Sequence, residues 1–206
     1  MDMNKKEELL ERANFILQDG VKNRDSLFHT LVLSSLCDGE IESRVMVLRE
    51  FNEKKRILRF HSDFRSNKIK ELEKDNKTPV IGYDPNLKVQ IRLIGETKIN
   101  YQNEDTQKSW ESSQAISKKC YSVKEGSSAK IENPKDVDFD IKSINIEDGY
   151  ENFCTLNFNY NILEFLYLQR SGHRRCRFSW NAKGEVKSIW LAVSYTHLTL
   201  PTIQPV

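Results

Sequence analysis

The sequence predicts an α+β protein built on an antiparallel β-barrel with a few peripheral helices. Two observations support this prediction. Roughly eight or nine short segments are rich in β-branched and aromatic residues or alternate apolar with polar residues, which is typical of strands. Turn signals such as Asp38-Gly39 separate neighbouring segments, so consecutive strands are expected to pair as hairpins.

The first element is an amphipathic helix, expected over residues 4–19. Apolar residues recur there at three- and four-residue spacing, with Glu and Lys between them. These residues are Leu9, Leu10, Ala13, Ile16 and Leu17. Gly20 follows directly and is expected to end the helix, because glycine is favoured just after a helix C-terminus.

The strands begin where the hydrophobic period changes, at Leu27. They are expected over residues 27–36, 41–50, 57–62, 78–84, 88–100, 152–159, 162–168, 175–180 and 186–192. Further turns are expected in the segment 51–56, at Pro85 and over Asn181-Ala182-Lys183-Gly184.

Two helical regions interrupt the strands. A helix is expected after the third strand, with Ser62 or Asp63 as its N-cap and Ile69 and Leu72 on its apolar face. Residues 103–120 are also predicted to be helical, with apolar contacts from Trp110, Ala115 and Ile116. Residues 121–149 are rich in Gly, Ser, Pro and Asp, and we expect mostly irregular chain with one helical turn.

A single domain is expected over residues 1–192. The final segment, 193–206, does not continue the strand pattern and resembles translated adaptor or vector sequence. A genuine C-terminal extension is the alternative. Neither a signal-peptide core nor a membrane-spanning apolar run is present in the sequence, so a cytoplasmic location is expected.

Composition narrows the possible functions. The chain has 206 residues, of which 38% are hydrophobic and 30% charged, with a formal net charge of +2. A chain this polar has a modest core, which favours an oligomer. The near-neutral charge argues against nucleic acid as a partner.

The four cysteines form no C-x-x-C motif and have no His at metal-ligand spacing. No metal site is therefore predicted, and the thiols are expected to be reduced.

Four segments carry residues that could bind an anionic ligand. In RVMVLR, Arg44 and Arg49 have odd spacing, so only one can face a given side unless a bulge re-aims the other. In HSDFRSNK, Ser62, Ser66 and Lys68 cluster where a strand turns into a helix, a place that suits a phosphate. The alternative for RVMVLR is two exposed arginines on an edge strand, and the alternative for HSDFRSNK is an ordinary helix cap.

The other two segments lie later in the chain. Gln90 is a polar residue within a strand, and its amide could both donate a hydrogen bond to a ligand and accept one from it. The segment HRRCR could supply donors to an anion from His173, Arg174, Arg175 and Arg177. The alternative for Gln90 is a solvent-facing strand residue, and the alternative for HRRCR is a basic surface turn.

Taken together, the four segments resemble the pyridoxamine 5'-phosphate oxidase-like superfamily, whose members are antiparallel split β-barrels that bind flavin mononucleotide (FMN). The family pattern is R-x-x-x-L-R/K, an aromatic-Thr/Ser strand end leading into S-x-K, Q-(I/V)-R-(I/V/L)-x-G, and H-x-R. The matching segments here are 44–49, His61-Ser62 with Ser66 and Lys68, 90–95, and 173–175. Order and spacing match, and the resemblance covers about residues 20–192.

The resemblance implies a role for each matched residue. Arg44, Ser62, Asn67 and Lys68 would hold the phosphate and ribityl chain of FMN. The flavin would be lined by Arg44, Val45, Met46, Val47, Leu48 and Arg49. His61 and Ser66 would also belong to the cofactor site. Gln90 would meet the flavin ring, and Arg175 would reach it from the other subunit of a homodimer with FMN at its interface. Arg49 and His173 would contact the substrate.

The sequence also departs from the family pattern. Arg49 stands where pyridoxamine phosphate oxidases have Lys, and residues 108–118 lack the Tyr and Arg that hold the substrate phosphate. The resemblance therefore implies an FMN-dependent oxidoreductase acting on an unknown small molecule, closest to the oxidase-related branch. One alternative is a flavin- or haem-binding split barrel without pyridoxamine phosphate oxidase activity, in which His61 or His173 could ligate haem. Another is a nucleic-acid-binding barrel using Phe60, Tyr83 and Tyr167. We expect neither nucleic acid nor a membrane as a partner.

Overall fold

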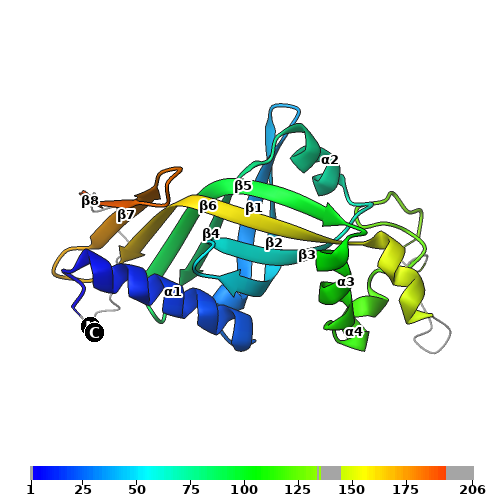
Figure 1. The fold of residues 1–206 in the computed structure, drawn as a ribbon, viewed down its shortest axis with the longest axis horizontal. Coiled ribbons are helices and arrows are strands. Elements are labelled where there is room, and N and C mark those ends of the chain that lie inside the picture. The colour runs from blue at the N-terminus through cyan, green and yellow to red at the C-terminus, as the bar shows by residue number, and fades with distance from the viewer. Residues whose placement is uncertain (1, 134, 136–144, 194–206) are drawn as a thin grey trace, which may run out of the picture.

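The computed structural model describes residues 2–133, 135 and 145–193 (Figure 1). The predicted adaptor-like tail lies, apart from residue 193, outside the described residues. The helices are α1 (Lys6–Lys22), α2 (Asn67–Lys74), α3 (Glu104–Glu111) and α4 (Ala115–Lys119), with short 3₁₀ helices η1 (Leu27–His29) and η3 (Ile146–Asn152). The strands are β1 (Thr30–Cys37), β2 (Glu40–Asn52), β3 (Ile57–Asp63), β4 (Lys77–Asp84), β5 (Val89–Tyr101), β6 (Phe153–Tyr167), β7 (Arg174–Trp180) and β8 (Val186–Leu191).

The strands form an antiparallel barrel, as predicted. Their order is β3-β2-β1-β4-β5-β6-β7-β8, and β3 also pairs with β6. This extra pairing closes β1 to β6 into a barrel of six strands, while β7 and β8 extend one edge beyond it. Helices α3 and α4 lie at the opposite end of the molecule from β7 and β8 (Figure 1). The predicted α+β split-barrel class is confirmed.

The predicted hairpins follow from turn residues that tolerate a positive φ. Asp38 and Gly39, with φ of 49° and 92°, connect β1 to β2 in the geometry that fits the strand twist. Gly184, with φ of 81°, lies in the predicted turn between β7 and β8. Local sequence thus determines the neighbours of most strands.

Strand β6 corrects one prediction. Residues 152–159 and 162–168 were expected to be separate strands, but they form one continuous strand of fifteen residues. The pairing with β5 shifts between Ile94 and Gly95, opposite Ile162 and Tyr160, which leaves Asn161 as an extra residue in β6. The polar stretch around Asn161 is therefore a bulge and not a turn.

Helix α1 covers the barrel with its apolar face. Leu9, Ala13, Ile16 and Leu17 are buried, as the periodicity predicts. The helix does not end at Gly20, however, but continues to Lys22. A Cβ at position 20 would lie 2.5 Å from the Phe28 carbonyl oxygen, so this glycine is needed for close packing and not for termination.

The remaining helices differ from the prediction at their ends. Helix α2 buries Ile69 and Leu72 as expected, but its N-cap is Ser66, because Ser62 and Asp63 still belong to β3. In the helical region 103–120, Trp110 is buried whereas Ile116 is 72% exposed. Helix η3 supplies a helical segment near the end of the region 121–149, part of which lies outside the described residues. In the described part of the chain, no helix is long and apolar enough to cross a membrane.

We predict that Gly95→Ala destabilises the barrel. A Cβ at position 95 would lie 2.0 Å from the Asn159 carbonyl oxygen and 2.6 Å from the Tyr160 Cα, which are backbone atoms fixed by pairing. Overpacking of this kind costs about 1–3 kcal/mol, measurable as the change in the free energy of unfolding in urea. The control is Lys98→Ala at an exposed site on the same strand, expected to change stability by less than about 0.5 kcal/mol. Equal stability of the two variants would contradict the role assigned to Gly95.

Candidate functional site

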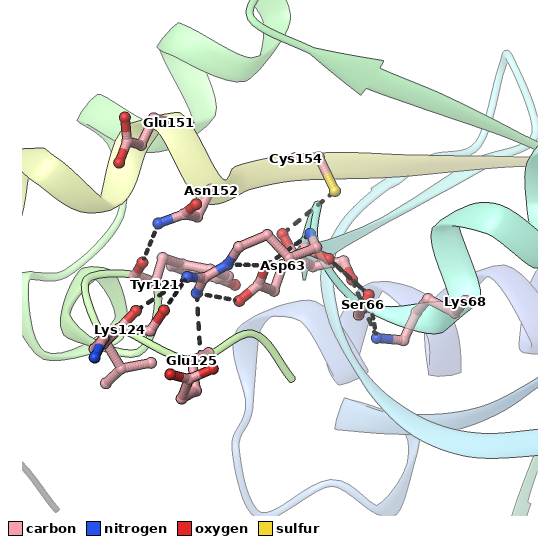
Figure 2. A network of polar contacts seen from close by, with 12 residues as sticks. Asp63, Ser66, Lys68, Tyr121, Lys124, Glu125, Glu151, Asn152 and Cys154 are labelled. Atoms are coloured by element: carbon pink, nitrogen blue, oxygen red, sulfur yellow. Dashed lines mark hydrogen bonds and ion pairs between the residues drawn. The ribbon is translucent and has the colours of Figure 1, made fainter. Parts of the chain in front are cut away.

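Lys68 lies at the start of α2 among buried hydroxyl groups. Its Nζ donates to Ser66 Oγ at 3.0 Å and to Ser62 Oγ at 3.3 Å. Ser66 Oγ donates to the Asp63 carbonyl at 2.6 Å, which fixes the turn from β3 into α2 (Figure 2). Burial, and then the nearby charge of Arg44, lower the pKa of Lys68 below its usual value. The ammonium group is therefore desolvated and contacts neutral oxygens, an arrangement that an anion would relieve.

Arg44 is fixed beside this group by a buried carboxylate. Its guanidinium donates to Glu71 Oε2 of α2 at 2.8 Å and also to Ser35 Oγ of β1. Ser35 Oγ in turn donates to the same Glu71 oxygen at 2.5 Å. Because Glu71 is only 5% exposed, these contacts hold the arginine in one orientation against α2.

A pocket of about 580 Å³ opens between β2 and α2 over these residues. We call it the α2 pocket. Its lining carries four cations, Arg44, Lys68, Lys70 and Lys74, and three acids, Asp38, Glu42 and Glu71. Asp38 pairs with Lys74 at 2.8 Å and Glu71 pairs with Arg44, so two of the acids are neutralised within the pocket. A phosphate would find its best-matched partners at Lys68 and the adjoining hydroxyls.

A second pocket, the bulge pocket, lies further along β2 and has a volume of about 200 Å³. The pairing of β2 with β3 shifts between Leu48 and Glu50, which places exposed Arg49 at a bulge. This pocket is rich in cations and hydroxyls: Arg24, Arg49, Arg59, Ser109, Ser112 and Ser113 are among its lining residues. One acid, Glu50, also lines it and pairs with Arg59 at 2.7 Å.

His61 lines the bulge pocket from β3 and is neutral at physiological pH. Burial, and then the charges of Arg49 and Arg59, lower its pKa to about 3. The imidazole ring meets the Phe153 ring edge-on, with centroids 4.9 Å apart. A neutral imidazole can accept one hydrogen bond and donate another, but it adds no positive charge to the pocket.

A third group of predicted residues lies on β5, β6 and β7. Gln90 pairs with Leu166, which pairs with Arg175, so these residues are neighbours across three strands. Arg175 is held by Glu164, with Nη2 2.5 Å from Oε2. His173 Nδ1 accepts from the Gln169 backbone N–H at 3.2 Å. None of these residues lines the α2 pocket or the bulge pocket.

Glu164 organises the arginines of this third group. Its carboxylate accepts from Arg175 and Arg177 and lies 3.6 Å from Arg92. Burial acts to raise the pKa of Glu164, but the hydrogen bonds and charges of the arginines outweigh burial and lower it. Three cations around one carboxylate give this cluster a net positive charge.

The structure thus sorts the predicted residues into separate places. Those that line the α2 pocket are Arg44, Val45, Met46, Asn67 and Lys68, with Ser62 and Ser66 buried beneath Lys68. Val47 is half-buried and Leu48 is in the core. Arg49 and His61 line the bulge pocket, and Gln90, His173 and Arg175 lie on the third face.

Sequence reasoning missed several residues of these sites. Glu71 and Glu164 look like ordinary surface acids in a helix and a strand, and only the tertiary contacts show that both are buried. Ser127 and Ser128 line the α2 pocket from a segment without periodicity. In the sequence, the only signal for these two serines is the excess of Gly and Ser in their segment. That excess predicts an ordinary loop as readily as a ligand-binding site.

Comparison with known proteins agrees with the barrel fold. Residues 13–101 match a family model described as pyridoxamine 5'-phosphate oxidase, FMN-binding domain. No curated protein matches the sequence.

Solved structures share the fold at low sequence identity. A pyridoxamine 5'-phosphate oxidase-related, FMN-binding protein from Nostoc punctiforme PCC 73102 is 18% identical, with a TM-score of 0.70 over 89% of this chain and 96% of its own. PhzG from Burkholderia lata 383, in complex with tetrahydrophenazine-1-carboxylic acid, is 17% identical, with a TM-score of 0.67 over 92% and 93%. Residues 13–101, which include Arg44 and Lys68, are thus similar to the FMN-binding domain of pyridoxamine 5'-phosphate oxidase.

Proposed function

We propose that this protein is an FMN-dependent oxidoreductase whose substrate is a small molecule with an anionic group. The observation that carries the proposal is that one strand, β2, lines two cationic pockets. Arg44 and Arg49 are separated by about 16 Å along an extended strand, so they serve different groups. We assign the cofactor phosphate to the α2 pocket and the substrate anion to the bulge pocket.

The residues of the α2 pocket fit a phosphate by their chemistry. Lys68 offers a desolvated ammonium group, and Asn67 and Lys68 follow the N-cap Ser66 at the start of α2. Val45 is 64% exposed and lines the α2 pocket from β2, where the flavin ring could cover it. When bound, FMN would supply the redox chemistry, while these residues hold and orient it.

The bulge pocket supports an anionic substrate. Arg24, Arg49 and Arg59 outnumber the single acid, and the lining serines can donate hydrogen bonds. The segment 108–118 lacks the Tyr and Arg expected for pyridoxamine phosphate, so we favour a carboxylate. PhzG, which shares the fold, is solved with a carboxylic acid.

We propose further that two copies of the chain associate. Large apolar side chains are exposed on the strands, among them Ile41, Val45, Tyr83 and Trp190. The arginines around Glu164 would then approach the cofactor from the partner. All four cysteines are free, which is consistent with a cytoplasmic location.

The first prediction tests the phosphate assignment. We expect Lys68→Met to weaken FMN binding about ten- to a hundredfold, because a hydrogen bond to a charged group contributes about 1.5–3 kcal/mol. Quenching of flavin fluorescence gives the dissociation constant, and riboflavin, which lacks the phosphate, should bind equally to both proteins. Lys98→Met is the control for an exposed lysine. An unchanged FMN affinity of Lys68→Met would refute the assignment.

The second prediction concerns the pH dependence of FMN affinity. Burial lowers the pKa of Lys68 below 10.5, so its positive charge is lost before that of an ordinary lysine as the pH rises. FMN affinity should therefore fall at alkaline pH, starting below 10.5. Lys68→Met should lack this pH dependence. The flavin ring also ionises at alkaline pH, so the affinity for riboflavin is measured over the same pH range and the FMN affinity is expressed relative to it. If the ratio of FMN affinity to riboflavin affinity stays constant up to pH 10.5, Lys68 does not bind the phosphate.

The third prediction tests the substrate pocket and turnover. Benzoate should perturb the visible spectrum of the FMN-loaded protein, and Arg49→Gln should weaken this effect about tenfold while FMN binds normally. Anaerobic mixing of the loaded protein with NADPH, or with pyridoxamine 5'-phosphate, then tests reduction of the flavin. Equal benzoate binding by Arg49→Gln would refute the anion assignment. Failure of a broad panel of donors to reduce the flavin would refute the oxidoreductase proposal.

A further inference from the structure

Arg65 connects the turn before α2 to a distant part of the chain. Its guanidinium pairs with the Asp63 carboxylate at 2.8 Å and donates to the carbonyl oxygens of Val123 and Lys124 at 3.1 and 2.9 Å. A longer contact, 3.5 Å, reaches the Glu125 carbonyl. One side chain thus holds three consecutive peptide groups of a segment that has no regular secondary structure.

The segment 121–128, which we call the strap, is fixed at further points. Asn152 Nδ2 donates to the Tyr121 carbonyl at 2.9 Å, and the Asn152 carbonyl accepts from the Phe64 backbone N–H at 2.7 Å. Figure 2 shows Tyr121, Lys124 and Glu125 gathered on one side of Asp63, with Ser66 and Lys68 on the other. Gly126 passes so close that a Cβ there would lie 2.8 Å from the Arg65 Cβ. The strap therefore packs directly against the residues that precede α2.

The far end of the strap reaches the α2 pocket. Ser127 and Ser128 line this pocket together with Arg44 and Lys68. A turn closed by the Ala129 N–H and the Gly126 carbonyl at 3.1 Å presents both serines. Ser128 has a φ of 72°, a conformation that glycine would adopt without strain. Serine at this position therefore strains the backbone, and a use for its hydroxyl would offset that strain.

We propose that the strap forms the outer wall of the cofactor phosphate site, with the hydroxyls of Ser127 and Ser128 as donors to the phosphate. Arg65 is the positioning residue that holds the strap there. The inference rests on the assignment of FMN to the α2 pocket. Uncharged hydroxyl donors suit this wall of the α2 pocket, because the pocket already contains paired acids and cations. A phosphate also has more acceptor positions than Lys68 and Arg44 can fill.

The experiment compares three variants by the ratio of FMN to riboflavin affinity. In Ser127→Ala/Ser128→Ala, FMN binding should weaken about tenfold or more, while riboflavin binding stays within about twofold. Ser128→Gly should weaken FMN binding as well, although it relieves strain and keeps the turn. Arg65→Gln should have the same effect as the double variant. Arg12→Gln, on α1, is the matched control for loss of an arginine.

Trypsin cleavage after Lys124 provides a readout independent of affinity. FMN should protect this bond in the wild-type protein, and Arg65→Gln should increase cleavage both with and without FMN. The serine variants should be cleaved like the wild type in the absence of FMN, which shows that the strap is still in place. Circular dichroism confirms that each variant is folded.

The outcomes are distinct. FMN affinity that is unchanged in both serine variants overturns the proposal, as does cleavage after Lys124 that neither FMN nor Arg65→Gln alters. Equal loss of FMN and riboflavin affinity in the serine variants also overturns it, because the strap would then not recognise the phosphate. A wild-type protein that binds FMN, but whose bound flavin is reduced by no donor, would refute the oxidoreductase proposal and leave the strap proposal to these binding tests.

Discussion

The pairing of β3 with β6 is the constraint on which the rest of the structure depends. It closes the barrel, and it also fixes the end of β3, where Ser62 pairs with Cys154 and Asp63 with Phe153. The same pairing holds His61 opposite Thr155, at the edge of the bulge pocket. The long-range hydrogen bonds of this pairing thus position Ser62, which lies beneath Lys68, and His61, which lines the bulge pocket.

The charges in the two pockets are arranged differently. In the α2 pocket, Glu71 neutralises Arg44 and holds it still, while Lys68 loses much of its hydration and contacts hydroxyl oxygens instead. In the bulge pocket, three arginines surround a histidine that stays neutral. Because a desolvated cation is costly, an anion that enters the α2 pocket would stabilise the charge of Lys68.

The sequence predicts those features of the fold that depend on local chemistry. Hairpin turns, the buried face of α1 and the apolar residues of α2 follow from glycine, aspartate and hydrophobic spacing. Features set by tertiary contacts were missed or misjudged: the start of α2 is delayed because β3 pairs with β6 through Asp63, and β6 continues because a bulge absorbs Asn161. The odd spacing of Arg44 and Arg49 raised the possibility of a bulge, and its place between Leu48 and Glu50 is visible only in the pairing.

Strand β6 also limits how a chain of this kind can change in length. It pairs with β3 and β5 at one end and with β5 and β7 at the other, so inserting one residue would turn every later side chain to the opposite face. Insertions and deletions are therefore tolerated mainly in the connections between strands and helices, and one described connection follows α4, from residue 120 to residue 133. This connection contains Ser127 and Ser128. A segment outside the barrel strands thus borders the α2 pocket, so a change in its length would alter the surroundings of the pocket and leave the barrel pairing intact.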